Sequence, residues 1–280
     1  MLMKSNFLIS GILYWALFTI LFSGAIFSRS SVMFSESFHQ LFDSISLTFG
    51  YYVSLMITKK PDKKFSYGYH RLEGISSILN FFIIITGIIL SVFITVYSLY
   101  YLIPVNGFYG FIISVVSLPF LTVPLYLLNK LKNSGINEKA NFKHNISDTF
   151  TLFIVVITML IIMLIKNNLI SIIIDTVSSF VIIIIFIITA YSILKDSASY
   201  LLDRSPDNIS EIENGLMVKY PGAHHLHVWK VCSHLTVATL HVTENGDKTL
   251  NELTSEEKSL NDILNKYGIN HSTIQFEIKK

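Results

Sequence analysis

The chain has 280 residues, of which 51% are hydrophobic and only 14% are charged, and its mean hydropathy is +0.55. A soluble domain of this length needs fewer apolar residues to fill its core, so the composition indicates that much of the chain lies in a lipid bilayer. The formal net charge of +2 gives no sign of nucleic acid binding, because the Lys and Arg residues cluster in particular loops.

Six apolar stretches are long enough to cross a membrane, which takes about 20 residues. The first stretch is longer than the apolar region of a signal peptide, and further stretches follow it, so we expect it to be an uncleaved first helix. The predicted spans cover residues 6–27, 32–57, 75–103, 107–131, 142–165 and 169–194.

The basic residues favour one orientation of these spans. They gather between the second and third spans and around the connection from the fourth to the fifth, whereas the other connections hold only Arg29 and Lys166. Loops rich in Lys and Arg stay in the cytosol, so we expect both termini there. The basic loops contain Lys59, Lys60, Lys63, Lys64, Arg71, Lys130, Lys132, Lys139 and Lys143.

The remaining residues, 201–280, have the composition of a small water-soluble domain, so we divide the chain into a transmembrane domain at 1–200 and a cytosolic domain. The order helix, strand, strand, helix, strand (αββαβ) predicts an α+β sandwich of ferredoxin-like type. About 80 residues is close to the smallest size that folds alone, so we expect a homodimer. Hydrophobic periodicity predicts helices at 208–220 and 250–267 and strands at 224–231, 235–243 and 273–278.

Two pairs of polar residues with the same spacing lie inside the predicted spans. His39 and Asp43 are in the second span, and His144 and Asp148 are in the fifth. Residues four apart share a helix face, so each pair projects its side chains together into the bundle. Two imidazole nitrogens and two carboxylate oxygens make a tetrahedral ligand set for Zn²⁺, and the carboxylates balance its charge. The spacing therefore predicts a metal site between two helices.

A single pair of this kind is also explained by an interhelical hydrogen bond or by a position near the headgroups. A shared site accounts for the repetition, which independent hydrogen bonds do not. His144 and Asp148 lie near the start of the fifth span, whereas His39 and Asp43 lie in the outer half of the second. The pairs therefore meet only if the fifth helix begins before Phe142, with a polar face along a water-filled cavity.

Longer segments carry a resemblance to a known family. They are SFHQLFDS in the second span, KHNISD in the fifth, SYGYHRLEGISSILN between the second and third, LLDR after the sixth, and HHLHVW, LHV and HSTIQFE in the tail. In these segments the chain resembles the cation diffusion facilitator family, and within it the zinc-transporting branch with the cobalt-zinc-cadmium resistance efflux proteins. The resemblance implies a secondary transporter and no enzyme. It would export Zn²⁺, or Cd²⁺ and Co²⁺, in exchange for protons by alternating access, and we expect it in a bacterial inner membrane.

The resemblance also implies roles for individual residues. The transport site of the family falls on the two His and Asp pairs. A basic and an acidic residue that could interlock helices at the dimer contact fall on Arg71 and Asp203, the alternative being two unlinked surface charges. The cytosolic metal site, where Zn²⁺ would be regulatory, falls on His224, His241 and Glu277, with His271 as a further candidate. Strand histidines that are only solvated or hydrogen-bonded are the alternative there.

Other positions depart from the family or match it without binding metal. Phe65 and Tyr69 stand where some relatives have a second site in the loop between the second and third helices, so we expect no metal site there. His70 is offset by one position, and we expect it to face the membrane surface. Asp175 and Asn80 match family positions that are not ligands, and we expect them to make hydrogen bonds between helices.

Two other functions remain open. A transporter of Mn²⁺ or Fe²⁺ would share the scaffold, although these ions favour more oxygen ligands than the two histidines leave. An intramembrane metalloenzyme would need three protein ligands and an open water position, and the spans contain no His-Glu-x-x-His motif. Proton coupling would follow from competition at the imidazoles, whose unperturbed pKa of about 6.5 is close to physiological pH.

Overall fold

The structure is a computed structural model that describes residues 2–131, 136–232 and 235–278, with side chains for 11–123, 146–195, 197–199, 201–232 and 235–278. The chain divides into two compact units. The first contains residues 1–54 and 79–193, and the second contains residues 55–78 and 194–280. The second unit therefore includes the loop between the second and third helices together with the C-terminal domain.

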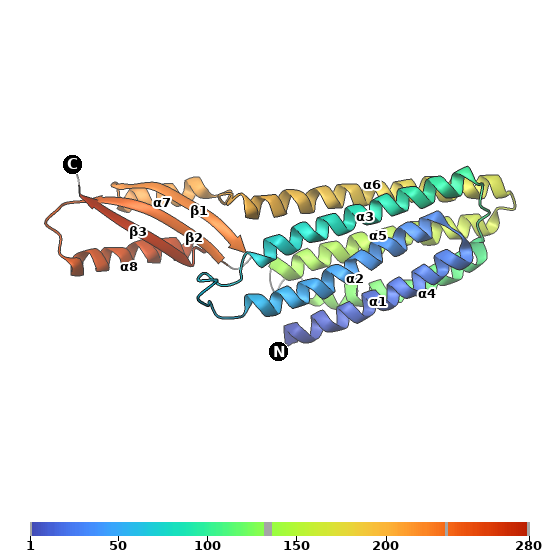
Figure 1. Cartoon of the computed structure of the whole chain (residues 1–280), viewed down its shortest axis with the longest axis horizontal. Helices are drawn as coiled ribbons and strands as arrows, with labels where there is room; N and C mark the ends of the chain where they lie inside the picture. Colours follow the sequence, from blue (N-terminus) through green and yellow to red (C-terminus); the bar gives the residue numbers. More distant parts are fainter. Residues whose placement is uncertain (1, 132–135, 233–234, 279–280) are drawn as a thin grey trace. The chain divides into compact units, whose positions relative to one another are not determined.

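Six long helices lead the chain, as the apolar stretches predict (Figure 1). In the described residues, four helices are long and apolar enough to cross a membrane, at Gly11–Ser28, Leu72–Tyr100, Ile146–Leu164 and Asn168–Ser199. The helix that contains Glu36, His39 and Asp43 is as long but more polar, and the described apolar stretch of the fourth, Gly107–Val123, is shorter. The six helices are α1 Leu2–Ser28, α2 Ser31–Ile57, α3 Leu72–Tyr100, α4 Gly107–Leu131, α5 Ile136–Leu164 and α6 Asn168–Leu201.

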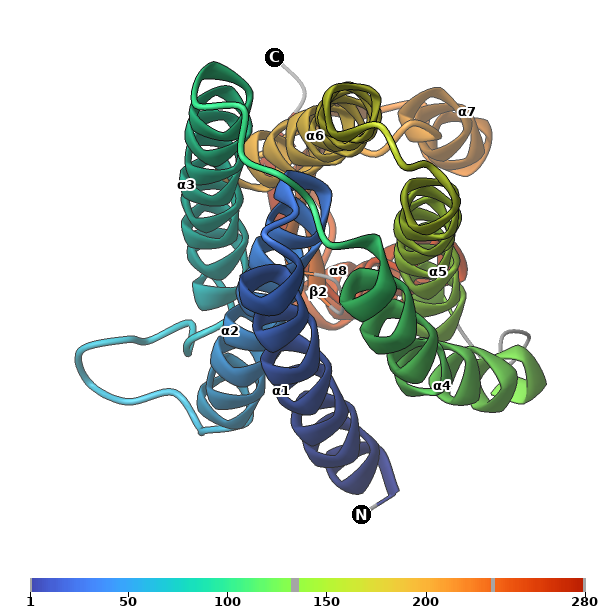
Figure 2. The same cartoon turned by 90° about the vertical axis from the view of Figure 1, so that its right-hand side faces the viewer.

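The first unit has a continuous apolar core. Helix α4 packs closely along both α1 and α5, and the view along the helices in Figure 2 shows it between them. α5 begins at Ile136, before Phe142, which is the helix start that the prediction of a shared site requires. Side chains from all six helices form this core, and those with no exposed surface include Leu17, Leu21, Met33, Leu121, Leu152, Met159 and Ile182.

Asp175 of α6 caps the N-terminus of α2. The first backbone N–H groups of a helix have no partner within it. The carboxylate of Asp175 accepts hydrogen bonds from the backbone N of Ser31 at 2.6 Å and of Val32 at 3.4 Å, and from the hydroxyls of Ser30 and Ser31 at 2.5 and 2.6 Å. The hydrogen-bonding role predicted for Asp175 is therefore observed, and it fixes the start of the helix that carries His39.

Hydrogen bonds also join α3 to α2 and α6. The hydroxyl of Ser179, one turn after Asp175, lies 2.8 Å from the hydroxyl of Ser35 and 2.6 Å from that of Thr95. Further along α2, the hydroxyl of Ser46 donates to the side-chain oxygen of Asn80. Asn80 thus has the interhelical role expected from the sequence.

The C-terminal domain has the predicted αββαβ order. Its sheet has the strand order β1-β2-β3, with β1 and β2 antiparallel and β2 and β3 parallel. Parallel neighbours need a crossover connection, which α8 supplies. Ile212, Leu216, Leu240, Leu260 and Leu264 form its separate apolar core. The elements are α7 Ile209–Lys219, β1 Ala223–Cys232, β2 Leu235–Glu244, α8 Leu250–Lys266 and β3 His271–Ile278.

Candidate metal centre

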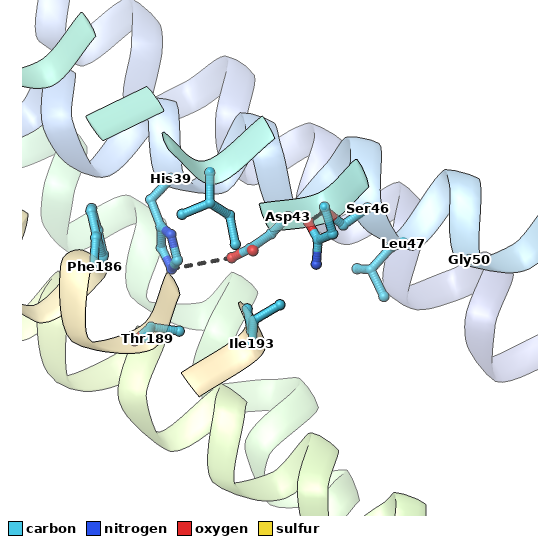
Figure 3. A pocket seen from close by; sticks show the side chains of 10 residues that line it. His39, Asp43, Ser46, Leu47, Gly50, Phe186, Thr189 and Ile193 are labelled. Atoms are coloured by element: carbon cyan, nitrogen blue, oxygen red, sulfur yellow. Dashed lines mark hydrogen bonds and ion pairs between the residues drawn. The ribbon is translucent and has the colours of Figure 1, made fainter. Parts of the chain in front are cut away.

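Three side chains from α2 and α5 meet inside the first unit. Nε2 of His39 lies 3.2 Å from Oδ2 of Asp43 and 3.3 Å from Oδ1 of Asp148. Figure 3 shows the contact between His39 and Asp43. All three side chains are buried, and their ligand atoms lie within 4.8 Å of one another. The structure therefore brings one residue of the α5 pair to the pair on α2.

The spacing of these atoms suits a small tetrahedral ion. Nitrogen and oxygen ligands about 2.0–2.2 Å from zinc lie roughly 3.3–3.6 Å apart at tetrahedral angles. The two separations from the His39 nitrogen, 3.2 and 3.3 Å, are close to that range, so the groups need to move little to hold an ion. His144 lies one turn before Asp148 on α5, but its side chain is outside the described residues, so the fourth ligand stays a prediction.

Two aromatic side chains hold these groups in place. The hydroxyl of Tyr14 on α1 donates a hydrogen bond of 3.0 Å to Oδ2 of Asp148. The ring of Phe186 on α6 stacks on the imidazole of His39, with 4.0 Å between centroids and 21° between planes. The contact of neither residue with the site can be predicted from the sequence, because an aromatic residue in an apolar helix belongs to no metal-binding pattern. They fix the orientation of two proposed ligands.

A further carboxylate, Glu36, lies one turn before His39. It is fully buried, and its Oε1 accepts hydrogen bonds of 3.2 Å from Nε2 of Gln40 and from the hydroxyl of Thr151. Its Oε2 has no hydrogen-bond partner among the described residues. Glu36 is not one of the three residues whose ligand atoms lie within 4.8 Å of one another, so it adds an acidic group beside the site.

A cavity of about 230 Å³ opens beside His39 and Asp43. It extends along the C-terminal half of α2, past Ser46 to Gly50, as Figure 3 shows. Water takes up about 30 Å³ per molecule in the liquid, so the cavity has room for several. The remaining lining residues are Leu47, Asn80, Ile84, Phe186, Thr189 and Ile193.

Comparison with known proteins places the chain in a family. Residues 7–202 match the family of the cation efflux transmembrane domain. The chain belongs to the cation efflux family. This confirms the resemblance to cation diffusion facilitators that the sequence motifs carry.

Curated members of the cation efflux family match nearly the whole chain. The metal cation efflux system protein CzcD of Cupriavidus metallidurans is 26% identical over 91% of this chain and 80% of its own length. The cadmium, cobalt and zinc/H(+)-K(+) antiporter of Bacillus velezensis is 26% identical over 98% of this chain and 88% of its own length. The zinc transporter ZitB of Yersinia pestis is 24% identical over 91% of this chain and 81% of its own length. The similarity therefore includes the C-terminal domain as well as the helices.

A second group of candidate ligands lies at one end of the sheet in the C-terminal domain. Glu277 of β3 lies 2.8 Å from Nδ1 of His241 on β2 and 3.4 Å from Nε2 of His224 on β1. The other nitrogen of His224 lies 3.0 Å from the carbonyl oxygen of Gly222, which fixes how its ring faces the cluster. The structure thus brings together three of the four residues that the resemblance assigns to this site.

His225 joins this cluster, although the sequence reading did not include it. Its ring centroid lies 5.3 Å from that of His241, and His224, His225 and His241 can offer ligand atoms within 4.8 Å of one another. Neighbouring residues of a regular strand point to opposite faces. His225 instead has a φ of 48°, and the pairing of β1 with β2 shifts between His224 and His227. This irregularity turns both histidines to one side.

His271 does not belong to the cluster within this chain. It pairs with Val237, whereas Gln275 pairs with His241 and Glu277 with Thr243. His271 and Glu277 are six positions apart, which corresponds to about 20 Å along a strand. Strand alternation places His271 on the same face as Glu277, but the register places it at the other end of β3. The assignment of His271 as a further ligand is corrected accordingly.

Arg71 and Asp203 form an ion pair within the second unit. Nη2 of Arg71 lies 3.4 Å from Oδ1 of Asp203, so the alternative interpretation, two unlinked surface charges, is wrong. Both side chains are exposed, at 60% and 45%, and an exposed pair of this kind adds little to stability. The pair joins the start of α3 to the residues just after α6, and its role in an interlock stays a prediction.

The loop between α2 and α3 contains an aromatic pair. The rings of Phe65 and Tyr69, where the family resemblance led us to expect no metal site, lie 4.9 Å apart. Asp62 accepts hydrogen bonds of 2.7 Å from the backbone N of Phe65, the hydroxyl of Tyr69 and the backbone N of Lys64, and these hold its pKa below the ordinary value. The aromatic pair and the turn at Asp62 order this loop.

His70 was expected to face the membrane surface. The structure corrects this expectation, because Nδ1 of His70 lies 3.5 Å from Sγ of Cys232 in the same unit. Cys232 itself is buried at the end of β1.

Proposed function

We propose that this protein exports Zn²⁺, with Cd²⁺ and Co²⁺ as further substrates, in exchange for protons. The proposed transport site consists of His39, Asp43, His144 and Asp148. The observation that carries the proposal is the meeting of His39, Asp43 and Asp148, which come from two helices and are buried at distances that suit zinc. The names of the relatives support the same class of substrate and, for the Bacillus velezensis protein, the exchange with protons.

The chemistry of the site supports zinc over harder ions. Imidazole nitrogen suits zinc, whereas Mn²⁺ prefers a set made of oxygen ligands. Buried Asp43 and Asp148 together carry the charge that a divalent ion needs for balance in a region of low dielectric. Membership of the cation efflux family supports a transporter rather than a metalloenzyme.

The cavity supplies an entry for the ion. The basic loop between α2 and α3 favours a cytosolic position for the C-terminal end of α2, and the cavity extends along that half of the helix. We therefore interpret the conformation as one that opens to the cytosol. Zn²⁺ enters beside Gly50, passes Ser46 and reaches Asp43 and His39.

Protons release the ion on the far side. Imidazole binds metal only in its neutral form, so zinc and protons compete for His39. After the helix bundle has rearranged to face outward, a more acidic exterior favours the protonated site and drives zinc out. Each cycle then returns protons to the cytosol, which couples zinc export to proton entry.

The C-terminal domain binds a regulatory zinc ion in this proposal. His224, His241 and Glu277 supply the ligands assigned from the family resemblance, and His225 adds a third imidazole. These groups are partly exposed at the edge of the domain, so cytosolic zinc can reach them. The domain forms a homodimer that responds to the ion, and both termini lie in the cytosol of a bacterial cell.

The transport site is tested by zinc uptake into inside-out vesicles with an imposed pH gradient. We expect Asp148→Ala to abolish uptake, because it removes a buried ligand and half of the balancing charge. Asp207→Ala is the matched control, since Asp207 is an exposed aspartate that pairs with Arg204 in the tail. Unchanged zinc uptake in Asp148→Ala would show that the transport site lies elsewhere. Parallel assays with Cd²⁺, Co²⁺ and Mn²⁺ define the range of substrates.

A further inference from the structure

Tyr14 connects α1 to the metal site, although α1 contains no side chain that commonly binds zinc. The helix has no His, Cys, Asp or Glu. Tyr14 is 5% exposed, packs in the core of the first unit and donates its hydroxyl hydrogen to Asp148. α1 therefore reaches the site through the hydrogen bond of Tyr14 to Asp148, a proposed ligand.

This hydrogen bond gives the two oxygens of Asp148 different roles. Oδ2 accepts from the Tyr14 hydroxyl at 3.0 Å, and Oδ1 lies 3.3 Å from Nε2 of His39. The carboxylate therefore turns one oxygen toward the site and the other toward α1. In this orientation the aspartate can offer one oxygen to an ion without giving up its bond to the phenol.

The number of oxygens offered bears on which ion fits. A tetrahedral zinc site takes one atom from each of four ligands. Larger, harder ions take more oxygens, often two from the same carboxylate. A carboxylate held by a second group in one-oxygen geometry thus favours the four-coordinate ion. Partners of this kind also tune affinity, since removing one costs about 10-fold to 100-fold in metal binding.

We propose that Tyr14 is a positioning residue for metal selectivity, whose hydroxyl holds Asp148 in one-oxygen geometry and so favours Zn²⁺ over Mn²⁺. The inference rests on the proposed function, because it takes Asp148 as a ligand of the transported ion. It assigns to α1 a part in selecting the ion. Tyr14 itself does not touch the metal.

The test compares Tyr14→Phe with wild type in proteoliposomes, with KM and kcat measured for Zn²⁺ and Mn²⁺ separately. We expect the KM for Zn²⁺ to rise about 10-fold or more, because the orienting bond is lost. The KM for Mn²⁺ should stay the same or fall, so the preference for zinc narrows. Tyr100→Phe is the control, since that tyrosine is 78% exposed at the end of α3.

A general loss of packing would give a different result. It would lower kcat or change the KM of both metals by the same factor, and either outcome overturns the proposal. Tyr14→Leu also lacks the hydroxyl but replaces the ring, so it must show the same relative shift between the metals. A shift in only one of the two variants contradicts a role for the hydroxyl.

The two proposals fail in different ways. If the transport site is wrong, Asp148→Ala still transports zinc. If only the role of Tyr14 is wrong, Asp148→Ala is inactive while Tyr14→Phe keeps the metal preference of the wild type.

Discussion

Replacing Asp175 by alanine removes four hydrogen bonds between the start of α2 and α6, while those of Ser179 with Ser31 and Ser35 remain. Two of the four lost bonds come from backbone N–H groups of α2 and two from the hydroxyls of Ser30 and Ser31. Hydrogen bonds between membrane helices contribute about 0.6 kcal/mol on average, with a maximum near 1.7 kcal/mol. At this average, four such bonds contribute about 2.4 kcal/mol. The two N–H groups left without a cap destabilise the folded state further. We expect the free energy of unfolding to fall by roughly 2–4 kcal/mol.

The free energy is measured by unfolding the purified protein with SDS in mixed micelles. Ser171→Ala is the matched control, because Ser171 lies one turn before Asp175 on the same helix and its hydroxyl donates to the carbonyl of Asn167 nearby. The zinc KM should also rise in Asp175→Ala, since the freed end of α2 no longer fixes His39. Equal stability of Asp175→Ala and Ser171→Ala would refute a cap on α2 by this carboxylate.

Two further predictions concern the C-terminal domain. His241→Ala should weaken zinc binding to the tail at least 10-fold, measured by calorimetry on the full chain with the transport site disabled by Asp148→Ala. His271→Ala should leave this binding unchanged. Equal losses of affinity in the two variants would show that His271 binds the same ion. Glu252 accepts hydrogen bonds from the backbone N and the hydroxyl of Thr249, which hold the pKa of its carboxyl below the ordinary value. The stability that the ionised carboxylate gives to the first turn of α8 is therefore complete above the ordinary pKa of a glutamate. It disappears as the pH falls through the lowered pKa of the folded state. Glu252→Gln should therefore speed amide hydrogen exchange in the first turn of α8 at pH 7 and lose this effect in acid, and a difference that persists in acid would exclude the carboxylate as its cause.

The sequence predicts the elements well because their patterns are local. The spacing of His39 and Asp43 implies a shared face in any helix, and the alternation of β3 implies which residues share a side. Helix ends are less predictable from apolar stretches. α5 begins at Ile136, several residues before its apolar part, because polar residues also continue a helix when hydropathy no longer marks it.

The parts that could not be predicted depend on contacts between elements. Tyr14 and Phe186 are ordinary residues of apolar helices, and only the packing of α1 and α6 against the site gives them their roles. His225 depends on an irregularity in β1 that nothing in its neighbours signals. His271 was assigned from the family resemblance, and its distance from Glu277 within the chain depends on the register of β3 with β2, which the sequence does not show.

Helix α6 contacts α2 at several points along its length, among them Ser179, whose hydroxyl lies 2.8 Å from that of Ser35. Asp175 holds the first residues of α2, and Phe186, three turns further along α6, lies against the ring of His39. Several contacts along a helix oppose both its sliding and its rotation relative to the neighbouring helix. We therefore expect α2 and α6 to move as one body, which keeps His39 and Asp43 in place relative to α6. In the proposed transport cycle, the position of Asp148 on α5 relative to this pair would then change when the site changes the side to which it opens.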